Sequence, residues 1–365
     1  MPVLNVEKLI AERVAALQKA HEDAHTPRAE LDLSGGVDSA VMACLLVLAL
    51  GPENVTLAHT RMSTAGAQTL RATNLSRALK CRVADGSFTG AFNVIMEELG
   101  RSLEAAGYNR EEIDARCEKD PTILGSIRSC LRAPLGRAYN RLTGGGLRHG
   151  TGNEDEDRVV RFYQKGGDGE VDSNPIAFLS KGETYQLALG LGNLMGPEVK
   201  AALLPIIEAT PSPDLWGTGD DHSDEAELKA WLKVPFTYSR INTETGEYKY
   251  VGTIERMNRT LDLSIPVHPN FTIEGGTSGY SVKFETVLFN KVLNTSDPAM
   301  DAMVRAARTY FPNNKFSYHE VRAFLLAARK AEAQTRHKMN PNCSTYGSRR
   351  ELVLGGILTN DLPEV

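Results

Sequence analysis

The sequence predicts an α/β protein in which a parallel sheet carries helices on both faces. Helical and strand-like patterns alternate along the first part of the chain, in the order helix 4–24, strand 29–33, a helix that follows residues 34–39 and ends at 50, strand 55–61, helix 65–79 and strand 81–84. This alternation is typical of parallel strands joined by helical crossovers. A glycine-rich segment follows the first strand directly, and no internal repeat or low-complexity tract interrupts the pattern.

The composition is that of an ordinary globular protein, with 41% apolar, 24% charged and 7% aromatic residues among 365. A net charge of −5 argues against nucleic acid as the main partner, so a phosphate site here must supply its own positive groups. The longest apolar run, residues 40–50, is too short to span a bilayer, and the N-terminus does not resemble a secretory signal. The five cysteines include no C-x-x-C pair. We therefore expect a cytoplasmic protein with no membrane partner.

The pattern changes after residue 228, where short β-like runs at 236–241, 248–254 and 281–289 are separated by turn signals. A helical pattern returns at residues 317–333. These changes predict three parts: a core at 1–228, an inserted β-rich subdomain at 229–316, and a C-terminal helical segment at 317–365 that completes the core. The insertion contains enough aromatic residues to form a small core of its own, so we expect a folded unit and not a flexible linker.

The strongest chemical signal is the hexapeptide Ser34-Gly35-Gly36-Val37-Asp38-Ser39 between the first strand and its helix. The two glycines let the backbone approach an anion closely, and loop amides with the helix N-terminus can then bind a pyrophosphate. The two serines add hydroxyl donors, and Asp38 is a hard oxygen ligand suited to Mg²⁺. The segment lacks the Gly-Lys-Ser/Thr ending of a Walker loop and is not G-x-G-x-x-G. It therefore favours cleavage between the α- and β-phosphates of ATP over transfer of the γ-phosphoryl group.

Further motifs follow in a fixed order: Gly150-Thr151-Gly152-Asn153-Glu154-Asp155-Glu156, Lys165-Gly166-Gly167-Asp168-Gly169-Glu170-Val171-Asp172, Leu179-Ser180-Lys181, Pro211-Ser212-Pro213-Asp214-Leu215 with Asp224-Glu225, and His337-Lys338. Together with the hexapeptide they resemble the ammonia-dependent NAD synthetase family of the PP-loop superfamily. The resemblance covers about residues 10–228 and 318–342. It implies a Rossmann-like sheet of the adenine nucleotide α-hydrolase type, with the β-rich insertion marking a divergent member.

The resemblance also implies which residues bind ATP and metal. The residues matching ATP contacts are Asp32, Leu33, Ser34, Gly35, Gly36, Val37, Asp38, Ser39, Thr151, Lys181 and Ser212. Asp38 and Glu156 match the two carboxylates that hold Mg²⁺. The spacing from Glu156 to Phe162 is one residue longer than in the family, so Asp157 is an alternative to Glu156.

The residues matching contacts to deamido-NAD are Lys165, Asp172, His337 and Lys338. A family arginine that touches this substrate is replaced by Cys130, and either Arg128 or Arg132 is its candidate substitute; we assign Arg132. Two further departures are Asp32, where the family often has glycine, and the segment 144–149, which is normally apolar but reads Gly-Gly-Gly-Leu-Arg-His.

The activity implied is ligation: ATP adenylates the nicotinate carboxylate of deamido-NAD with release of pyrophosphate, and ammonia then displaces AMP to give NAD. The phosphate loop begins at residue 34, which leaves no room before it for a glutaminase domain, so free ammonia is the expected nitrogen donor. Family members form homodimers, and we expect one here. The alternatives are a PP-loop tRNA-modifying enzyme, which predicts a basic surface and paired cysteines, and a nucleotide sensor that has lost turnover.

Overall fold

The computed structural model describes most of the first 249 residues and scattered positions beyond them. The described residues are 5–160, 163–164, 166–212, 223–227, 238, 240–249, 319, 323, 327, 344–345, 352 and 354–357. Most of the expected insertion at 229–316 lies outside them, as do Lys165, His337 and Lys338. Within the insertion, the two-residue strands β6 (Arg240–Ile241) and β7 (Tyr248–Lys249) form an antiparallel pair.

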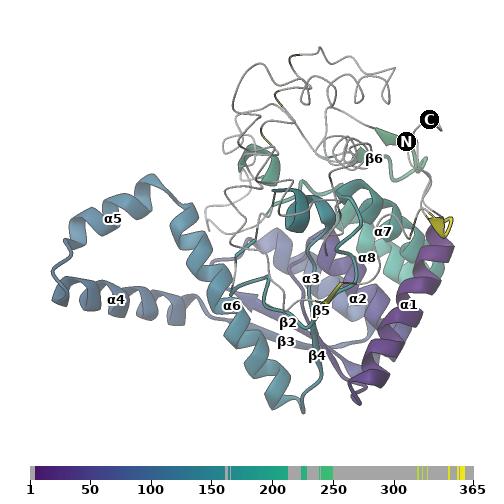
Figure 1. Cartoon of the computed structure of the whole chain (residues 1–365), viewed down its shortest axis with the longest axis horizontal. Helices are drawn as coiled ribbons and strands as arrows, with labels where there is room; N and C mark the ends of the chain where they lie inside the picture. Colours follow the sequence, from purple (N-terminus) through teal and green to yellow (C-terminus); the bar gives the residue numbers. More distant parts are fainter. Residues whose placement is uncertain are drawn as a thin grey trace, which may run out of the picture.

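The main sheet is parallel, and its described strands lie in the order β3-β2-β1-β4-β5-β8 (Figure 1). Their bounds are Ala29–Asp32 for β1, Val55–Arg61 for β2, Arg82–Ser87 for β3, Leu147–His149 for β4, Ser173–Asn174 for β5 and Ser344–Thr345 for β8. This confirms the predicted fold class. The chain runs outward in opposite directions from the neighbouring strands β1 and β4, and ligands of such sheets bind at the carboxyl ends of that pair.

One face of the sheet carries the apolar core. Helix α2 packs here against four other helices and is therefore apolar on nearly all sides. The helices of this face are α1 (Val6–Asp23), α2 (Val37–Leu50), α3 (Gly66–Leu79), α7 (Lys181–Met195) and α8 (Pro197–Glu208). Leu352 and Ile357 from the C-terminal part join the same core. In the part of the chain that the structure describes, no helix has the length and apolar character needed to cross a membrane.

The opposite face is covered by α6 (Thr122–Leu142), which packs on β1, β2 and β4. Its buried positions are small or polar: Gly125, Arg128, Ser129, Ala133, Gly136 and Asn140. Arg148 of β4 fills the space beside Gly136, where a Cβ would overlap its guanidinium group. Side chains alternate along β1, so Leu31 faces the apolar core while Glu30 and Asp32 face α6.

Arg148 binds both of these carboxylates. Its Nε lies 3.1 Å from Oε2 of Glu30, one terminal nitrogen pairs with Asp32, and the other donates to the Ala133 carbonyl at 2.8 Å. Burial and the neighbouring Asp32 raise the pKa of Glu30 to about 8, while Arg148 acts in the opposite direction. The two departures seen in the sequence, Asp32 and Arg148, are therefore partners of each other.

Helices α4 (Thr89–Ala105) and α5 (Arg110–Lys119) project from the sheet as an arm (Figure 1). Arg110 ties the arm together, with nitrogens 3.1 Å from carboxylate oxygens of both Glu97 and Asp114. The sequence analysis predicted neither helix.

Replacing Arg148 should test how far this polar face depends on one side chain. Arg148→Met leaves the buried Glu30 and the partly exposed Asp32 without their cation, so we expect the free energy of unfolding to fall by about 3–5 kcal/mol in urea denaturation. Arg137→Met, which removes a half-exposed ion pair with Asp172, should cost only about 1 kcal/mol. Adding Glu30→Leu to Arg148→Met should recover part of the loss. A double variant no more stable than Arg148→Met would contradict this account.

Candidate active site

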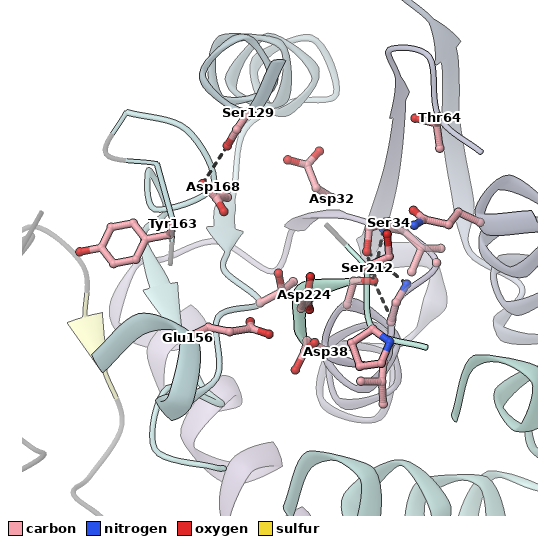
Figure 2. A pocket seen from close by; sticks show the side chains of 18 of the residues that line it. Asp32, Ser34, Asp38, Thr64, Ser129, Glu156, Tyr163, Asp168, Ser212 and Asp224 are labelled. Atoms are coloured by element: carbon pink, nitrogen blue, oxygen red, sulfur yellow. Dashed lines mark hydrogen bonds between the residues drawn. The ribbon is translucent and has the colours of Figure 1, made fainter. Parts of the chain in front are cut away.

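A cavity of about 980 Å³ opens where β1 and β4 end (Figure 2). The glycine-rich loop, residues 32–39, forms one wall, and Ser129 and Arg132 of α6 contribute to another. The remaining predicted residues that line the cavity are Thr151, Glu156, Lys181 and Ser212. Residues from separate sequence motifs are thus brought to a single site.

The loop needs glycine at position 35 for two reasons. Gly35 has a φ of +85°, which side-chain-bearing residues rarely adopt. A Cβ there would also overlap the carbonyl oxygen of Gln68 on α3. The carbonyl of Gly35 accepts a hydrogen bond from Nε of Arg71 at 3.1 Å, so α3 fixes the loop from outside.

The two loop serines close the turn before α2. The hydroxyls of Ser34 and Ser39 lie 3.0 Å apart, and Ser39 Oγ donates to the Gly36 carbonyl at 3.0 Å. Gly36, the N-cap of α2, and Val37, its first residue, both line the cavity, so the positive end of this helix borders it. Such a turn suits a phosphate or pyrophosphate group.

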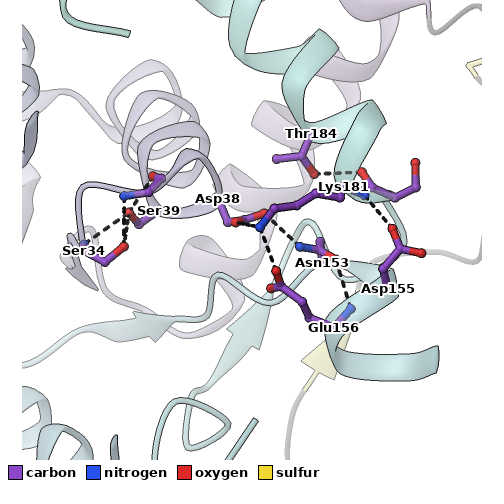
Figure 3. A network of polar contacts seen from close by, with 10 residues as sticks. Ser34, Asp38, Ser39, Asn153, Asp155, Glu156, Lys181 and Thr184 are labelled. Atoms are coloured by element: carbon purple, nitrogen blue, oxygen red, sulfur yellow. Dashed lines mark hydrogen bonds and ion pairs between the residues drawn. The ribbon is translucent and has the colours of Figure 1, made fainter. Parts of the chain in front are cut away.

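Lys181 connects the loop helix to the turn that follows β4 (Figure 3). Its Nζ lies 2.6 Å from Oδ2 of Asp38 and 2.7 Å from Oε1 of Glu156. Asn153 holds the same two residues: its Nδ2 donates to Asp38 Oδ1 at 3.0 Å, and its Oδ1 accepts from the Glu156 amide at 3.1 Å. The lysine begins α7, where the backbone is fixed by a capping box between Ser180 and Glu183.

Burial dominates the electrostatics of this cluster. It raises the pKa of Glu156, which Lys181 opposes, and raises the pKa of nearby Asp224 to about 8. Burial also disfavours the charged form of Lys181, but Asp38 and Glu156 outweigh it and raise the lysine pKa. Lys181 therefore remains a cation, and it is shared among several carboxylates.

The Asp38 and Glu156 carboxylates fit a magnesium ion. Their oxygens converge on one point, as their shared contact with a single ammonium group demonstrates. Proteins usually bind Mg²⁺ through one or two carboxylates, with substrate phosphates and water completing the shell. Among the described residues there is no cluster of three or more His, Cys, Asp or Glu side chains that could hold a metal ion alone.

The structure distinguishes Glu156 from Asp157. Glu156 lines the cavity, whereas Asp157 does not. The Asp157 carboxylate packs against Gly152, where it occupies the space that a Cβ would need, and it accepts a hydrogen bond from Asn174 Nδ2 at 2.8 Å. Both residues lie in a π-helical stretch, Asp155–Val160.

On the opposite wall, the segment after Tyr163 is fastened to α6. Ser129 Oγ donates to Asp168 Oδ1 at 2.8 Å, and Ser126 Oγ donates to Gln164 Oε1 at 2.9 Å. Arg132 lines the cavity beside this segment, whereas Arg128 is buried with its guanidinium 4.9 Å from the centre of the Phe92 ring. Of the two arginines near Cys130, only Arg132 lines the cavity.

Asp172 does not line the cavity. Its carboxylate accepts two bonds from Arg137, at 2.8 and 2.9 Å, and one from the Arg148 amide at 2.8 Å. Burial opposes ionisation of Asp172, but the hydrogen bonds from Arg137 outweigh it and lower its pKa.

Sequence reasoning assigned no role to three residues of the site: Asn153, Asp168 and Asp224. All three lie inside the motifs that carry the resemblance, and this position was the signal that could have identified them as site residues. A buried amide between two carboxylates, however, cannot be recognised before the fold brings them together.

The NAD synthase family model matches residues 9–242, well over half of the chain. This chain belongs to the NAD synthase family. The NH(3)-dependent NAD(+) synthetase of Archaeoglobus fulgidus is 30% identical over 239 residues, covering 63% of this chain and 85% of the relative. The enzyme of the same name from Methanosarcina acetivorans is 30% identical over 234 residues, covering 63% and 80%. The solved NMN synthetase of Francisella tularensis shares the fold, with a TM-score of 0.50, 22% identity and coverage of 62% of this chain and 82% of that chain.

The NAD synthase match extends beyond residue 228, where the insertion was expected to begin. Tyr238, within this extra stretch, is fully buried, and its ring centre lies 5.4 Å from Nζ of Lys181. Its amide donates to Oε1 of Glu225 at 2.8 Å, so the stretch is attached beside the site.

Two isosteric substitutions should separate the adjacent acids. Glu156→Gln removes a carboxylate that faces the cavity, and we expect ATP–pyrophosphate exchange to fall on the order of a thousandfold. Asp38→Asn should behave in the same way. Asp157→Asn should change the rate only by about threefold, because its carboxylate points away from the cavity. An inactive Asp157→Asn with an active Glu156→Gln would reverse the assignment.

Proposed function

We propose that this member of the NAD synthase family is an ammonia-dependent NAD synthetase that amidates deamido-NAD at the expense of ATP. The observation that carries the proposal is the convergence of a pyrophosphate-type loop, two carboxylates and a buried lysine in one cavity. The names of the relatives from Archaeoglobus fulgidus and Methanosarcina acetivorans support ammonia as the nitrogen donor.

The reaction follows from the poor reactivity of a carboxylate. A carboxylate oxygen of the nicotinate group attacks the α-phosphorus of ATP. The bond between the α-phosphorus and the oxygen that bridges it to the β-phosphate breaks, and pyrophosphate leaves. Ammonia then attacks the acyl carbon of the adenylate, AMP leaves with the bonding electrons, and the nitrogen releases a proton to solvent. No covalent bond to the protein is required, so its task is to position anions and stabilise developing charge.

The proposed ATP site uses the loop amides and the Ser34 and Ser39 hydroxyls for the leaving pyrophosphate, with Lys181 as the compensating cation. Thr151 and Ser212 are the further proposed ATP contacts, and both line the same cavity. Asp38 and Glu156 would hold Mg²⁺, which when bound neutralises phosphate charge and so makes pyrophosphate a better leaving group.

For the dinucleotide we propose Arg132, which lines the cavity on the α6 side. Lys165, His337 and Lys338 complete the proposal on the strength of the sequence motif alone. Asp172 is omitted, because its carboxylate is occupied by Arg137 and the Arg148 amide. We retain a cytoplasmic location as part of the proposal; the four cysteines in the described region, Cys44, Cys81, Cys117 and Cys130, form no disulfide with one another.

The decisive measurement is product formation by the purified chain with ATP, Mg²⁺ and ammonium. We expect one NAD, one AMP and one pyrophosphate for each deamido-NAD consumed, loss of activity in EDTA, and recovery with Mg²⁺. Glutamine in place of ammonium should give little product. A parallel reaction with nicotinate mononucleotide tests the activity named for the Francisella tularensis structure. Formation of NMN without NAD would reassign the acceptor, and formation of neither would overturn the proposal.

We also propose that the chain acts as a homodimer through the arm. Helix α4 exposes Ile95, Leu99 and Leu103, four residues apart on one side, next to Val94, which is 63% exposed. A projecting helix with such a face is suited to packing against a second copy.

Charged substitutions on this face should dissociate the dimer. Val94→Asp with Leu99→Asp should shift the mass measured by light scattering from two chains to one, because each carboxylate would be buried without a partner. Leu142→Asp is the matched control: Leu142 is 84% exposed at the end of α6, and the change should leave the mass unaltered. A monomeric wild-type chain, or a dimer that survives both substitutions, would contradict the arm interface.

A further inference from the structure

The ammonium group of Lys181 binds the oxygens that a metal ion would use. One oxygen of each carboxylate is involved, Oδ2 of Asp38 at 2.6 Å and Oε1 of Glu156 at 2.7 Å (Figure 3). The second oxygen of Asp38 accepts from Asn153 at 3.0 Å, so the carboxylate is fixed and cannot present a different edge freely. The lysine side chain is 4% exposed, and water therefore screens this contact little.

A divalent cation and this ammonium group exclude each other. Magnesium binds carboxylate oxygens at about 2.0–2.1 Å, closer than the ammonium does. With both cations on the same pair of oxygens, their repulsion would be strong, because a partly buried site has a low effective dielectric constant. Either the metal is bound weakly, or the ammonium moves away.

The surroundings of Lys181 determine where it can move. The ring of Tyr238, itself fully buried, lies on one side of Nζ at 5.4 Å, and the lysine lines the cavity on another. The phosphate loop borders that cavity and runs directly into Asp38. Phosphate oxygens bound by the loop would therefore offer the flexible lysine a new anionic partner close to the old one.

We propose that Lys181 is an internal competitor of the divalent cation, which makes tight metal binding depend on bound nucleotide. Before nucleotide binds, the ammonium group holds Asp38 and Glu156 together in the geometry that the metal later needs. When nucleotide phosphates replace the two carboxylates as partners of the ammonium group, both carboxylate oxygens become available to the divalent cation. This inference rests on the metal site of the proposed function, but it does not depend on which acceptor is amidated.

The test is Mn²⁺ binding to the nucleotide-free full chain, followed by electron paramagnetic resonance. Lys181→Met and Lys181→Gln remove the charge, and each should bind Mn²⁺ at least about tenfold more tightly than the wild type. Lys181→Arg keeps the charge and should remain close to the wild type. Arg132→Met removes one positive charge from the same cavity without an ion pair to Asp38 or Glu156, and should change the affinity less than about threefold.

Thermal unfolding gives a second, independent readout. Lys181→Met should melt at a lower temperature than the wild type in EDTA, since buried carboxylates lose their cation, and Mn²⁺ should raise its melting temperature more than that of the wild type. Lys181→Gln, which retains an N–H donor, provides the same comparison if the methionine variant does not fold. Equal Mn²⁺ affinities of wild type and neutral variants, or no Mn²⁺ binding by the neutral variants, would overturn the proposed competition between Lys181 and the divalent cation. Absence of NAD formation alongside the expected Mn²⁺ differences would overturn only the proposed function.

Discussion

The buried guanidinium of Arg148 is the interaction on which the second face of the sheet depends. A charge in this position is tolerated only with partners, and its partners come from β1 and from the α6 backbone. Close approach of α6 requires Gly136, since any Cβ there would occupy the space of the guanidinium. Arg148 thus links the strand that leads into the phosphate loop, the strand that leads into Thr151 and the helix that carries Arg132, in addition to the pairing of the two strands in the sheet.

The cavity above this contact is more acidic than its expected ligands would suggest. Its described lining includes seven acidic side chains, Asp32, Asp38, Asp120, Glu156, Asp168, Asp224 and Glu227, but only three arginines and lysines, Arg71, Arg132 and Lys181. Two nucleotides would bring further negative charge. Backbone amides and the N-terminus of α2 provide part of the compensation, and a divalent cation would provide the rest. The proposed function would therefore require cations that arrive with the substrate.

The sequence was sufficient to predict the helices and strands that have a clear apolar periodicity, and to predict the glycine-rich loop. The strand predicted at 29–33 is observed as β1, one residue shorter, the helix predicted to end at residue 50 is α2, and the strand predicted at 55–61 is β2. Apolar side chains on the core face determine both the element and its register. Helix α6 gave no such signal, since its buried face is made of glycine, serine, alanine, asparagine and arginine. For the same reason Asp32 and Arg148 read as separate departures from the family pattern: each is anomalous alone, and only the parallel pairing of β1 with β4 makes them partners.

The extra residue between Glu156 and Phe162 shows how a local change can leave a site intact. A π-helix closes its hydrogen bonds over five residues where an α-helix uses four, so one widened turn can absorb one inserted residue. The structure has such a turn at Asp155–Val160, which begins two residues after Asn153. The widened turn thus accommodates the one extra residue after Asn153, while Asn153 still binds Asp38 and the Glu156 amide. Glu156 keeps its place opposite Asp38, and the shift in spacing falls on Asp157, whose carboxylate binds Asn174 and does not line the cavity.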